Sequence, residues 1–393
     1  MKSIRRIAII TSCEDDWGGC EELWCRSIPY LQQAGYTLSV IRKKLNRQHP
    51  EFIRLAKTGV TLFDLCTFSK EDKVHKAAKL LYKIYGKLFG VEYILSPPYR
   101  FKKWLKNNTP TLVIVSQSIN FDGLRYASVC HELGIHYVIV SHKAVDFYWP
   151  AQSDRKYMIR VFRDALHCFF VSKHNLLLTE EQFGIRFNNA SVIFNPLRVE
   201  RLVPYPQVVN EFRLACVGRL FLLDKGQDIL IRIMASPLWK NRNLKISFIG
   251  KGIDEEGLKE MAALLNVDKV EFKGQITDFS KICEEHHAFI LPSRSEGMPL
   301  VIVEAMAAGR MVIASKAGGN GEMIEEGVTG YLGLASEPDF EAAMERAWNN
   351  RHRWHLMGLA ASQRIAHRIP LSPESVFAKK IISLTDRQVF SSI

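Results

Sequence analysis

The chain has 393 residues, 47% of them hydrophobic and 24% charged, and its formal net charge is +12 at pH 7. This composition is that of a globular protein of about two domains, and it excludes a collagen, a disordered chain and a multi-span membrane protein. Residues 1–200 carry a formal charge of +11 and residues 201–393 one of +1, which indicates an anionic partner for the first half: a nucleic acid, a membrane surface or a phosphorylated substrate.

The first apolar stretch, residues 7–10, is too short for a signal peptide and is followed by acidic residues. We expect it to be the first strand. From there on, short apolar runs alternate with segments of helical periodicity, which predicts parallel sheets with crossover helices. The predicted strands are residues 6–11, 37–41, 60–64, 112–116, 137–141, 168–172, 191–194, 213–218, 245–250, 270–272, 288–291 and 311–314.

This alternation occurs twice, and a stretch with three prolines, residues 195–210, separates the two halves. The sequence therefore predicts an α/β protein of two doubly wound, Rossmann-like domains, residues 1–195 and residues 196–372. A last helix, about residues 373–393, is followed by no strand, and we expect it to return to the first domain.

None of the eight cysteines forms a Cys-x-x-Cys motif, and several lie in apolar strands. This pattern predicts free, buried thiols in a reducing compartment and neither a disulfide framework nor a zinc site. No apolar run reaches the roughly 18–20 residues that a membrane-spanning helix needs. We therefore expect a cytoplasmic location.

The segment from Ser69 to Lys106 is strongly basic. Its lysines recur every three or four residues, apolar residues fill another helical face, and Phe101 and Trp104 stand among the last lysines. One interpretation is a helix that lies on an anionic membrane surface. The other is a helix packed on a sheet with its lysines in water, and the charge asymmetry slightly favours the membrane.

A strand–loop–helix junction spans residues 291–304, and such junctions bind ligands in doubly wound folds. The loop carries Glu296 and Gly297, the helix begins near Pro299, and Glu304 lies inside it. A helix start offers free N–H groups to a phosphate. Because two glutamates eight residues apart also occur by chance, a purely structural role stays open.

Other predicted strand ends carry candidate ligand groups. Arg219 and Lys225 follow the strand 213–218 and could clamp a diphosphate. Gly18 and Gly19 follow the first strand and allow a close backbone approach to a ligand. His142 ends the strand 137–141 and could donate to a substrate. Each group also has an ordinary structural interpretation. A dinucleotide oxidoreductase is poorly supported, because no Gly-x-Gly-x-x-Gly motif stands in the right place.

Four segments, in register, resemble the motifs of the retaining, nucleotide-sugar-dependent glycosyltransferases of family 4. They are residues 17–24, 217–231, 243–252 and 293–332, and the last is similar to the family's Glu-x7-Glu block with the Gly-Gly-x-x-Glu segment after it. The resemblance covers most of the chain. It implies the GT-B architecture, with two Rossmann-like domains facing across a cleft, the first binding the acceptor and the second the donor.

The resemblance also implies roles for individual residues. Glu304 would bind the donor's ribose, and Glu296 would contact the transferred sugar, with His142 beside it. Arg219 and Lys225 would neutralise the leaving diphosphate. The catalytic residues implied are Glu296, His142, Arg219 and Lys225, and the donor-binding residues implied are Gly18, Gly19, Arg219, Lys225, Glu296, Gly297, Met298, Pro299, Leu300 and Glu304.

The activity implied is that of a retaining hexosyltransferase that needs no metal and no cofactor, and the chain has no Asp-x-Asp motif. A UDP-sugar is favoured over a GDP-sugar as donor. The acceptor would be a glycan or lipid-linked molecule of surface polysaccharide or glycolipid synthesis, met at the inner face of the cell membrane. No nucleic acid partner is expected. The alternatives are a nucleotide-sugar epimerase on the same fold and a non-catalytic membrane-binding protein.

Overall fold

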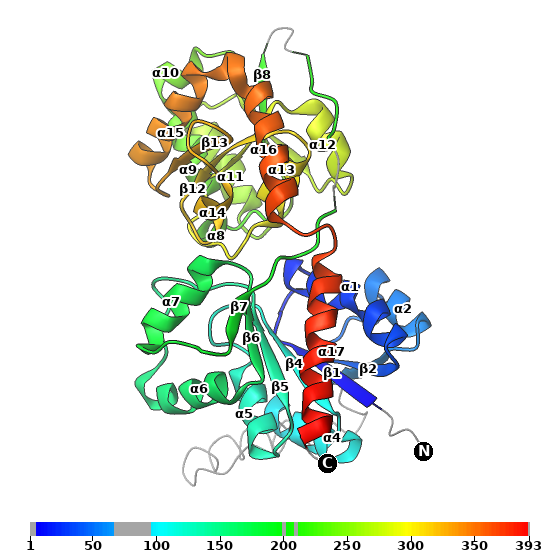
Figure 1. Cartoon of the computed structure of the whole chain (residues 1–393). Helices are drawn as coiled ribbons and strands as arrows, with labels where there is room; N and C mark the ends of the chain where they lie inside the picture. Colours follow the sequence, from blue (N-terminus) through cyan, green and yellow to red (C-terminus); the bar gives the residue numbers. More distant parts are fainter. Residues whose placement is uncertain (1–4, 67–95, 199–201, 208–210, 392–393) are drawn as a thin grey trace. The chain divides into compact units, whose positions relative to one another are not determined.

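The computed structural model describes residues 5–66, 96–198, 202–207 and 211–391, which form two α/β units (Figure 1). The first unit contains the described residues up to 170, residues 176–193 and the C-terminal residues from 374 onward. The second contains residues 171–175 and 194–373. The short stretch 171–175 was expected in the first domain, but Val171 is buried in a core of the second unit.

The described residues of the first unit contain a seven-stranded parallel sheet in the order β3-β2-β1-β4-β5-β6-β7. Its strands are β1 (Arg5–Thr11), β2 (Tyr36–Arg42), β3 (Thr61–Asp64), β4 (Leu112–Gln117), β5 (Tyr137–Ser141), β6 (His167–Phe170) and β7 (Ala190–Val192). The strand order reverses between β1 and β4, and ligands bind at such a switch point in doubly wound sheets.

Helices cover both faces of this sheet, as the nearly all-apolar strands predict (Figure 1). One face is covered by α4 (Pro97–Asn108), α5 (Leu124–Glu132), α6 (Gln152–Asp164) and α7 (Lys173–Phe183). The other is covered by α1 (Gly19–Gln33), α2 (Pro50–Lys57) and α17 (Pro373–Ser391). The last helix does return to the first unit, because Phe377 packs against Phe169 and Asp386 pairs with Arg5 at 2.8 Å.

The second unit has a six-stranded parallel sheet within the described residues, in the order β10-β9-β8-β11-β12-β13. Its strands are β8 (Phe212–Val217), β9 (Leu244–Ile249), β10 (Val270–Gly274), β11 (Ala288–Leu291), β12 (Met311–Ser315) and β13 (Gly330–Gly333). Its helices are α8 (Leu222–Lys225), α9 (Gln227–Ala235), α10 (Pro237–Lys240), α11 (Glu255–Leu264), α12 (Phe279–Glu285), α13 (Leu300–Ala307), α14 (Asn320–Met323), α15 (Glu337–Asn349) and α16 (Trp354–Arg368), with a 3-10 turn at Arg351–Arg353.

The predicted fold class is confirmed: both sheets are parallel, and both have a hydrophobic core on each face. All twelve predicted strands are present. The strand β13 was not predicted. Its Gly330 lies so close to β12 that an added Cβ atom would be 2.0 Å from the carbonyl oxygen of Val312, so packing selects glycine over the β-branched residues typical of strands.

The predicted linker is attached to the second unit in its described part. Arg310, 1% exposed, donates to the carbonyl oxygens of Val203 and Pro204, and Tyr205 stacks on His355 with ring centroids 4.4 Å apart. A buried arginine that binds only carbonyl oxygens of loops fixes their path without a counter-ion. Residues 203–205 of the predicted linker therefore belong to the second unit.

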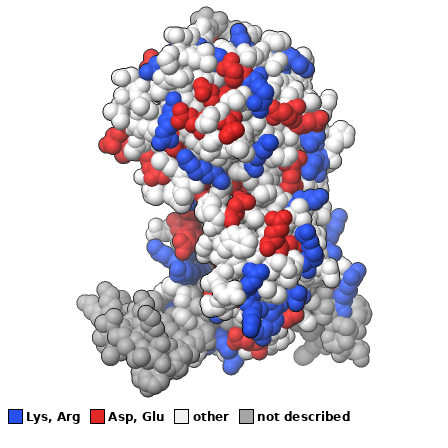
Figure 2. All heavy atoms as spheres, turned by 90° about the vertical axis from the view of Figure 1, so that its left-hand side faces the viewer, with Lys and Arg blue, Asp and Glu red and all other residues white. Residues whose placement is uncertain are grey.

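Residues 69–95 of the predicted basic segment lie outside the described residues. In its described remainder, α4 buries Phe101 and Trp104 in the core of the first unit. The aromatic side chains that the membrane interpretation invoked are thus core residues, and for this part of the segment that interpretation is wrong. Among the described helices, none combines the length and the apolar character needed to cross a bilayer. Figure 2 shows the charged side chains on the side of the molecule that carries α6 and α7.

Candidate functional site

The carboxyl edge of the second sheet brings two predicted residues into contact. Lys225 ends α8 in the connection after β8, and Glu296 lies in the loop after β11. The Nζ atom of Lys225 is 2.6 Å from Oε1 of Glu296, and the two side chains are 20% and 8% exposed. A charge-assisted hydrogen bond at this burial fixes both groups at the edge where doubly wound sheets bind ligands.

A second ion pair fastens the same two loops together. Arg294 donates to both carboxylate oxygens of Asp228, at 2.7 and 2.9 Å, and the N–H groups of Arg294 and Ser295 donate to the carbonyl oxygen of Asp224. Burial by itself would raise the pKa of Asp228, but hydrogen bonds from Arg294 and Arg232 outweigh it and lower the pKa. This planar, two-bond contact holds the loop of Glu296 against the loop of Lys225.

The helix α13 begins beside Glu296. Its N-cap is Pro299, its first residue is Leu300, and the preceding Met298 is buried. The carbonyl oxygen of Gly297 accepts a hydrogen bond from the N–H group of Gly319 at 2.7 Å. The loops after β11 and β12 therefore touch at the helix start, where the first backbone N–H groups have no partner within the helix.

Glu304 lies one turn into α13 and is 2% exposed. Its Oε1 atom accepts from the backbone N–H group of Arg198 at 3.1 Å and lies 3.4 Å from the side-chain Nε of the same residue. Arg198 was not among the predicted site residues. Its position in an irregular segment, 106 residues before Glu304, gave no periodicity from which the contact could be inferred.

Arg219 is half exposed and lies 3.6 Å from Asp224. Its loop passes close to the loop after β9. An added Cβ atom at Gly250 would be 2.0 Å from the carbonyl oxygen of Gly218, and one at Gly252 would be 2.1 Å from that of Leu220. The Gly250-x-Gly252 motif thus permits two backbones to meet, which is a different use from the phosphate-binding fingerprint.

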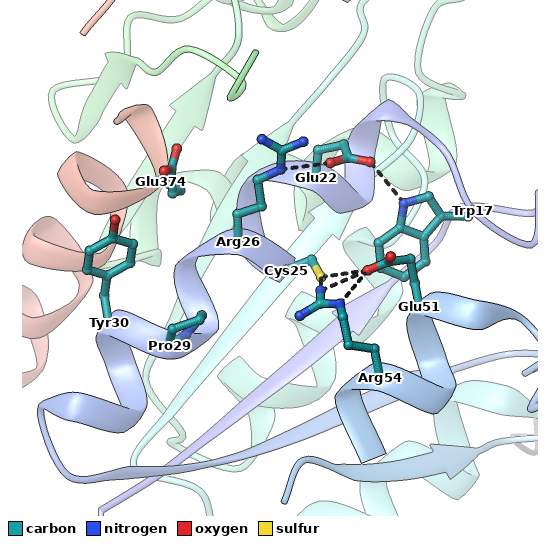
Figure 3. Close-up of a pocket in the computed structure, with 9 residues that line it drawn as sticks. All are labelled: Trp17, Glu22, Cys25, Arg26, Pro29, Tyr30, Glu51, Arg54 and Glu374. Atoms are coloured by element: carbon teal, nitrogen blue, oxygen red, sulfur yellow. Dashed lines mark hydrogen bonds and ion pairs between the residues drawn. The ribbon is translucent and has the colours of Figure 1, made fainter. Parts of the chain in front are cut away.

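The first unit holds a cavity of about 610 Å³ between α1, α2 and the start of α17 (Figure 3). Two ion pairs line it, Arg26 with Glu22 at 3.1 Å and Arg54 with Glu51 at 2.8 Å. Trp17, the residue before the predicted Gly18, donates from its indole to Glu22. The lining residues are Trp17, Glu22, Cys25, Arg26, Pro29, Tyr30, Glu51, Arg54 and Glu374, none of which was predicted as a site residue.

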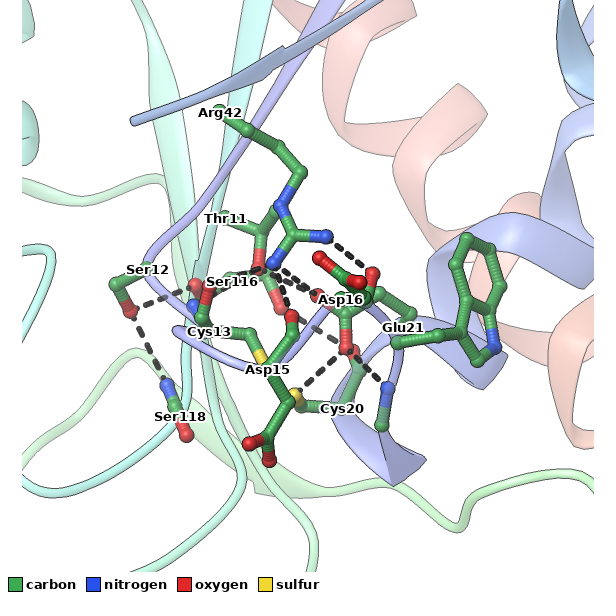
Figure 4. A network of polar contacts seen from close by, with 12 residues as sticks. Thr11, Ser12, Cys13, Asp15, Asp16, Cys20, Glu21, Arg42, Ser116 and Ser118 are labelled. Carbon is green, nitrogen blue, oxygen red and sulfur yellow. Dashed lines mark hydrogen bonds and ion pairs between the residues drawn. The ribbon is translucent and has the colours of Figure 1, made fainter. Parts of the chain in front are cut away.

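The loop that leads to Gly18 and to the start of α1 at Gly19 is anchored by buried charged side chains (Figure 4). Gly18 caps α1, and its N–H group donates to Glu21, whose other carboxylate oxygen accepts from Thr11. Burial raises the pKa of Glu21. Arg42, 2% exposed, donates to three carbonyl oxygens of the loop, those of Cys13, Asp15 and Asp16. The glycines therefore stand on a preorganised loop.

Cysteine side chains gather under the same loop. All eight cysteines are free, six of them buried, and the Sγ atoms of Cys13 and Cys20 lie within 4.8 Å of each other and of a Glu21 oxygen. Such atoms can hold a metal ion. Here the thiol of Cys20 is hydrogen-bonded to Glu21 at 2.8 Å, and its contact with Cys13, together with burial, raises its pKa.

His142 follows β5, at the same sheet edge as Gly18, and is 7% exposed. Burial lowers its pKa to about 3, so the imidazole is neutral near pH 7.

The connection after β4 adds Asp122, which was not predicted. Burial raises the pKa of Asp122 to about 6, although its carboxylate accepts from Ser12 and from the N–H groups of Ser118 and Ile119. Strand-end position was a usable signal for Asp122, whereas its burial was not visible in the sequence.

Comparison with known proteins finds a family match within the second unit. Residues 211–350 match the family described as glycosyl transferases group 1. The matched range includes the predicted donor residues from Arg219 to Glu304, whereas Gly18, Gly19 and His142 lie outside it.

The relatives and solved structures agree with this family match. The chain is 32% identical over 157 residues to an uncharacterized glycosyltransferase of Haemophilus influenzae, a match that covers 39% of this chain and 43% of the relative. It is 32% identical over 113 residues, 28% of this chain and 20% of the relative, to the Vi polysaccharide biosynthesis protein VipC/TviE of Salmonella typhi. The chain spans about half or less of the length of the curated relatives that it matches.

Among solved structures, Anabaena Alr3699/HepE in complex with UDP superposes on this chain with a TM-score of 0.72. The superposition covers 96% of this chain and 99% of the other, at 17% sequence identity. At that identity the likeness concerns the fold. It extends over both units, so the chain as a whole has the GT-B fold.

Proposed function

We propose that the chain is a glycosyltransferase that moves a hexose from a nucleotide diphosphate sugar to a glycan or lipid-linked acceptor, with retention of configuration and without a metal. The observation that carries this proposal is the Lys225–Glu296 pair, held at 2.6 Å on the carboxyl edge of the second sheet beside the start of α13. In this pair the ammonium of Lys225 would bind the donor's diphosphate, and the carboxylate of Glu296 would accept a hydrogen bond from a hydroxyl of the sugar.

The reaction needs positive charge where the leaving group forms. Cleavage of the bond between the anomeric carbon and the diphosphate leaves negative charge on the diphosphate. The ammonium of Lys225 and the guanidinium of Arg219 would neutralise it, and the N–H groups at the start of α13 would add to their effect. The start of α13 belongs to the fold and is in place before the reaction, so its N–H groups need little reorganisation at the transition state.

The two glutamates would hold the two halves of the donor. Glu304, buried on α13, would accept from the ribose hydroxyls, and Glu296 from a hydroxyl of the transferred sugar. The backbone N–H groups of Gly297 and Met298 would bind beside them. Departure and attack on the same face of the sugar would retain the configuration, and this route needs no covalent enzyme intermediate.

The first unit would contribute Gly18, Gly19 and His142. The loop of the two glycines is braced by Arg42, and its N–H groups would approach the diphosphate. Because burial keeps His142 neutral, it would donate a hydrogen bond to the sugar and would not act as an imidazolium acid.

A UDP-sugar is favoured as the donor, since the similar Anabaena structure contains UDP. A role in surface polysaccharide or glycolipid synthesis fits the name of the Salmonella relative. We place this work at the cytoplasmic face of the cell membrane, where nucleotide sugars and lipid-linked acceptors meet.

A thermal-shift panel with UDP, GDP, ADP, UDP-sugars and GDP-sugars tests the donor. A ligand at a hundredfold excess over its Kd stabilises the folded protein by about 2.7 kcal/mol. We expect stabilisation by UDP and UDP-sugars, its loss in Glu304→Ala, and its retention in Glu256→Ala, a control at an exposed glutamate of α11. Stabilisation by none of these ligands would contradict the proposed function.

A further inference from the structure

The connection between β5 and α6 exposes three consecutive aromatic side chains. Phe147, Tyr148 and Trp149 are 69%, 52% and 59% exposed, whereas exposed apolar side chains of this size usually occur singly. The indole N–H group of Trp149 donates to the carbonyl oxygen of Asp146 at 2.9 Å. Its polar atom is thus satisfied within the loop, and the three rings present mainly apolar surface to water.

Buried amides hold this loop in place. Gln182, on α7, donates to the carbonyl oxygens of Val145 at 2.8 Å and Tyr148 at 3.1 Å. Asn120 accepts from the N–H group of Val145 at 2.7 Å and donates to Gln182 at 3.0 Å. Neither amide is more than 1% exposed. Because this network of buried hydrogen bonds fixes the loop, the three rings are held in their exposed positions.

The helix that follows, α6, carries positive charge on its exposed side. Along α6, cations stand at spacings of four and three residues on the solvent face, while Met158 and Phe162 face the core. These cations are Lys156, Arg160 and Arg163. Among the described residues none of them forms an ion pair, whereas the acids at the two ends of α6, Asp154 and Asp164, are paired with Arg125 and His131. Figure 2 shows Lys and Arg side chains gathered over this part of the first unit.

We propose that the three rings and the three cations, together the aromatic–basic surface, bind the surface of an anionic lipid bilayer. Aromatic rings settle at the level of lipid headgroups, and lysines and arginines are attracted by anionic lipids. The most exposed ring, Phe147, has no polar atom, and the three cations of α6 lack acidic partners among the described residues. A sugar ligand would instead require hydrogen-bonding groups around the rings.

This surface is distinct from the segment that the sequence suggested for the same purpose. It starts five residues after His142, so docking would bring the end of β5 to the bilayer. There, an acceptor anchored in lipid would be presented to the transferase. This last step rests on the proposed function, whereas the docking itself does not.

Vesicle sedimentation with the full chain tests the docking without any donor. The probes are phosphatidylcholine vesicles with and without phosphatidylglycerol, at low and high salt. We expect binding only to the anionic vesicles, weaker at high salt. Neutralising the three cations, Lys156→Gln with Arg160→Gln and Arg163→Gln, should weaken binding on the order of 100-fold, at about 1 kcal/mol for each charge. Phe147→Ser with Trp149→Ser should weaken it about tenfold or more.

Two matched controls belong to the same unit. Lys44→Gln, Lys57→Gln and Lys379→Gln together remove the same charge from exposed positions, and Ile53→Ser removes an exposed apolar side chain from α2. Both should leave vesicle binding nearly unchanged. Far-ultraviolet circular dichroism and the stabilisation by UDP should be the same in every variant, which separates loss of docking from misfolding and from failure of the proposed function.

Three results would overturn the proposal. The first is that the wild-type chain binds no anionic vesicles. The second is that binding survives in both surface variants, which would assign it to other residues of the chain. The third is that the aromatic variant raises the KM for a soluble glycan acceptor while vesicle binding is unchanged, which would make the rings a sugar contact.

Discussion

Replacing Lys225 by methionine keeps most of the side chain's bulk and removes its charge. In the ligand-free site, the ammonium of Lys225 is 2.6 Å from the carboxylate of Glu296, and that carboxylate is 8% exposed. Without the cation, a nearly buried negative charge loses its partner. We expect Lys225→Met to lower the free energy of unfolding by about 1–3 kcal/mol, less than for a fully buried pair because Lys225 itself is 20% exposed.

The same substitution should weaken nucleotide binding. A charge-assisted contact to the diphosphate contributes about 1.5–3 kcal/mol, so the Kd for UDP should rise roughly 10- to 150-fold. The opposite is expected of Glu296→Gln. That change removes a carboxylate that competes with the diphosphate for Lys225, and UDP should bind about 2- to 10-fold more tightly while sugar transfer falls. The opposite signs distinguish a donor site from a structural ion pair.

Isothermal titration with UDP and denaturant unfolding give both quantities for the two variants and their combination. Lys281→Met, at an exposed lysine of α12, is the matched control and should change neither. If both site variants weakened UDP binding equally, or if neither changed it, the assignment of Lys225 to the diphosphate would be wrong. A coupling energy near zero between the two changes would show that the pair adds nothing to stability.

Four further outcomes are expected. Asp228→Ala, which removes a carboxylate held by a partly buried two-bond contact to arginine, should cost about 1–3 kcal/mol in denaturant unfolding. Burial raises the pKa of Asp122 from 3.8 to about 6, so folding favours its protonated form. The resulting stabilisation of the folded state, at most about 3 kcal/mol, is present below about pH 4 and is lost as the pH rises through 6. Unfolding experiments on Asp122→Asn should lack this pH dependence. His142→Gln should lower kcat yet leave the shape of the kcat/KM profile unchanged from about pH 5 to 8, since the pKa of His142 is lowered to about 3. Gly252→Ala should cost about 2 kcal/mol or more and weaken UDP binding, whereas Gly257→Ala, in open space, should do neither.

The fold could be predicted because its strands are buried on both faces. Strands such as Leu112–Gln117 and Ala288–Leu291 are buried at every position and begin with or consist of apolar runs, so their sequence alone marks them. The strand Gly330–Gly333 could not be found in this way. Its glycines are required by the closeness of β12, and that closeness is a property of the assembled sheet.

The candidate site was located by strand ends but not by contacts. Parallel strands bring their carboxyl ends to one edge, which suffices to place Lys225 and Glu296 near each other. That they meet at 2.6 Å depends on the pairing of Arg294 with Asp228, which no spacing in the sequence reveals. Arg198 was missed for a similar reason, because its position on Glu304 is set by the path of an irregular linker.

Both glutamates of the candidate donor site have a basic partner in the ligand-free structure, Glu296 in Lys225 and Glu304 in Arg198. The two contacts differ in what a donor must do to them. The side chain of Arg198 is 53% exposed and 3.4 Å from the carboxylate, so ribose hydroxyls can take over Glu304 at the cost of a weak ion pair. Lys225 is much less exposed and is bound closely. In the proposed reaction a diphosphate would share Lys225 with Glu296, and the ammonium would shift toward the leaving group as that group gains negative charge. The interaction would then strengthen as the bond breaks, which is the condition under which binding energy accelerates a reaction.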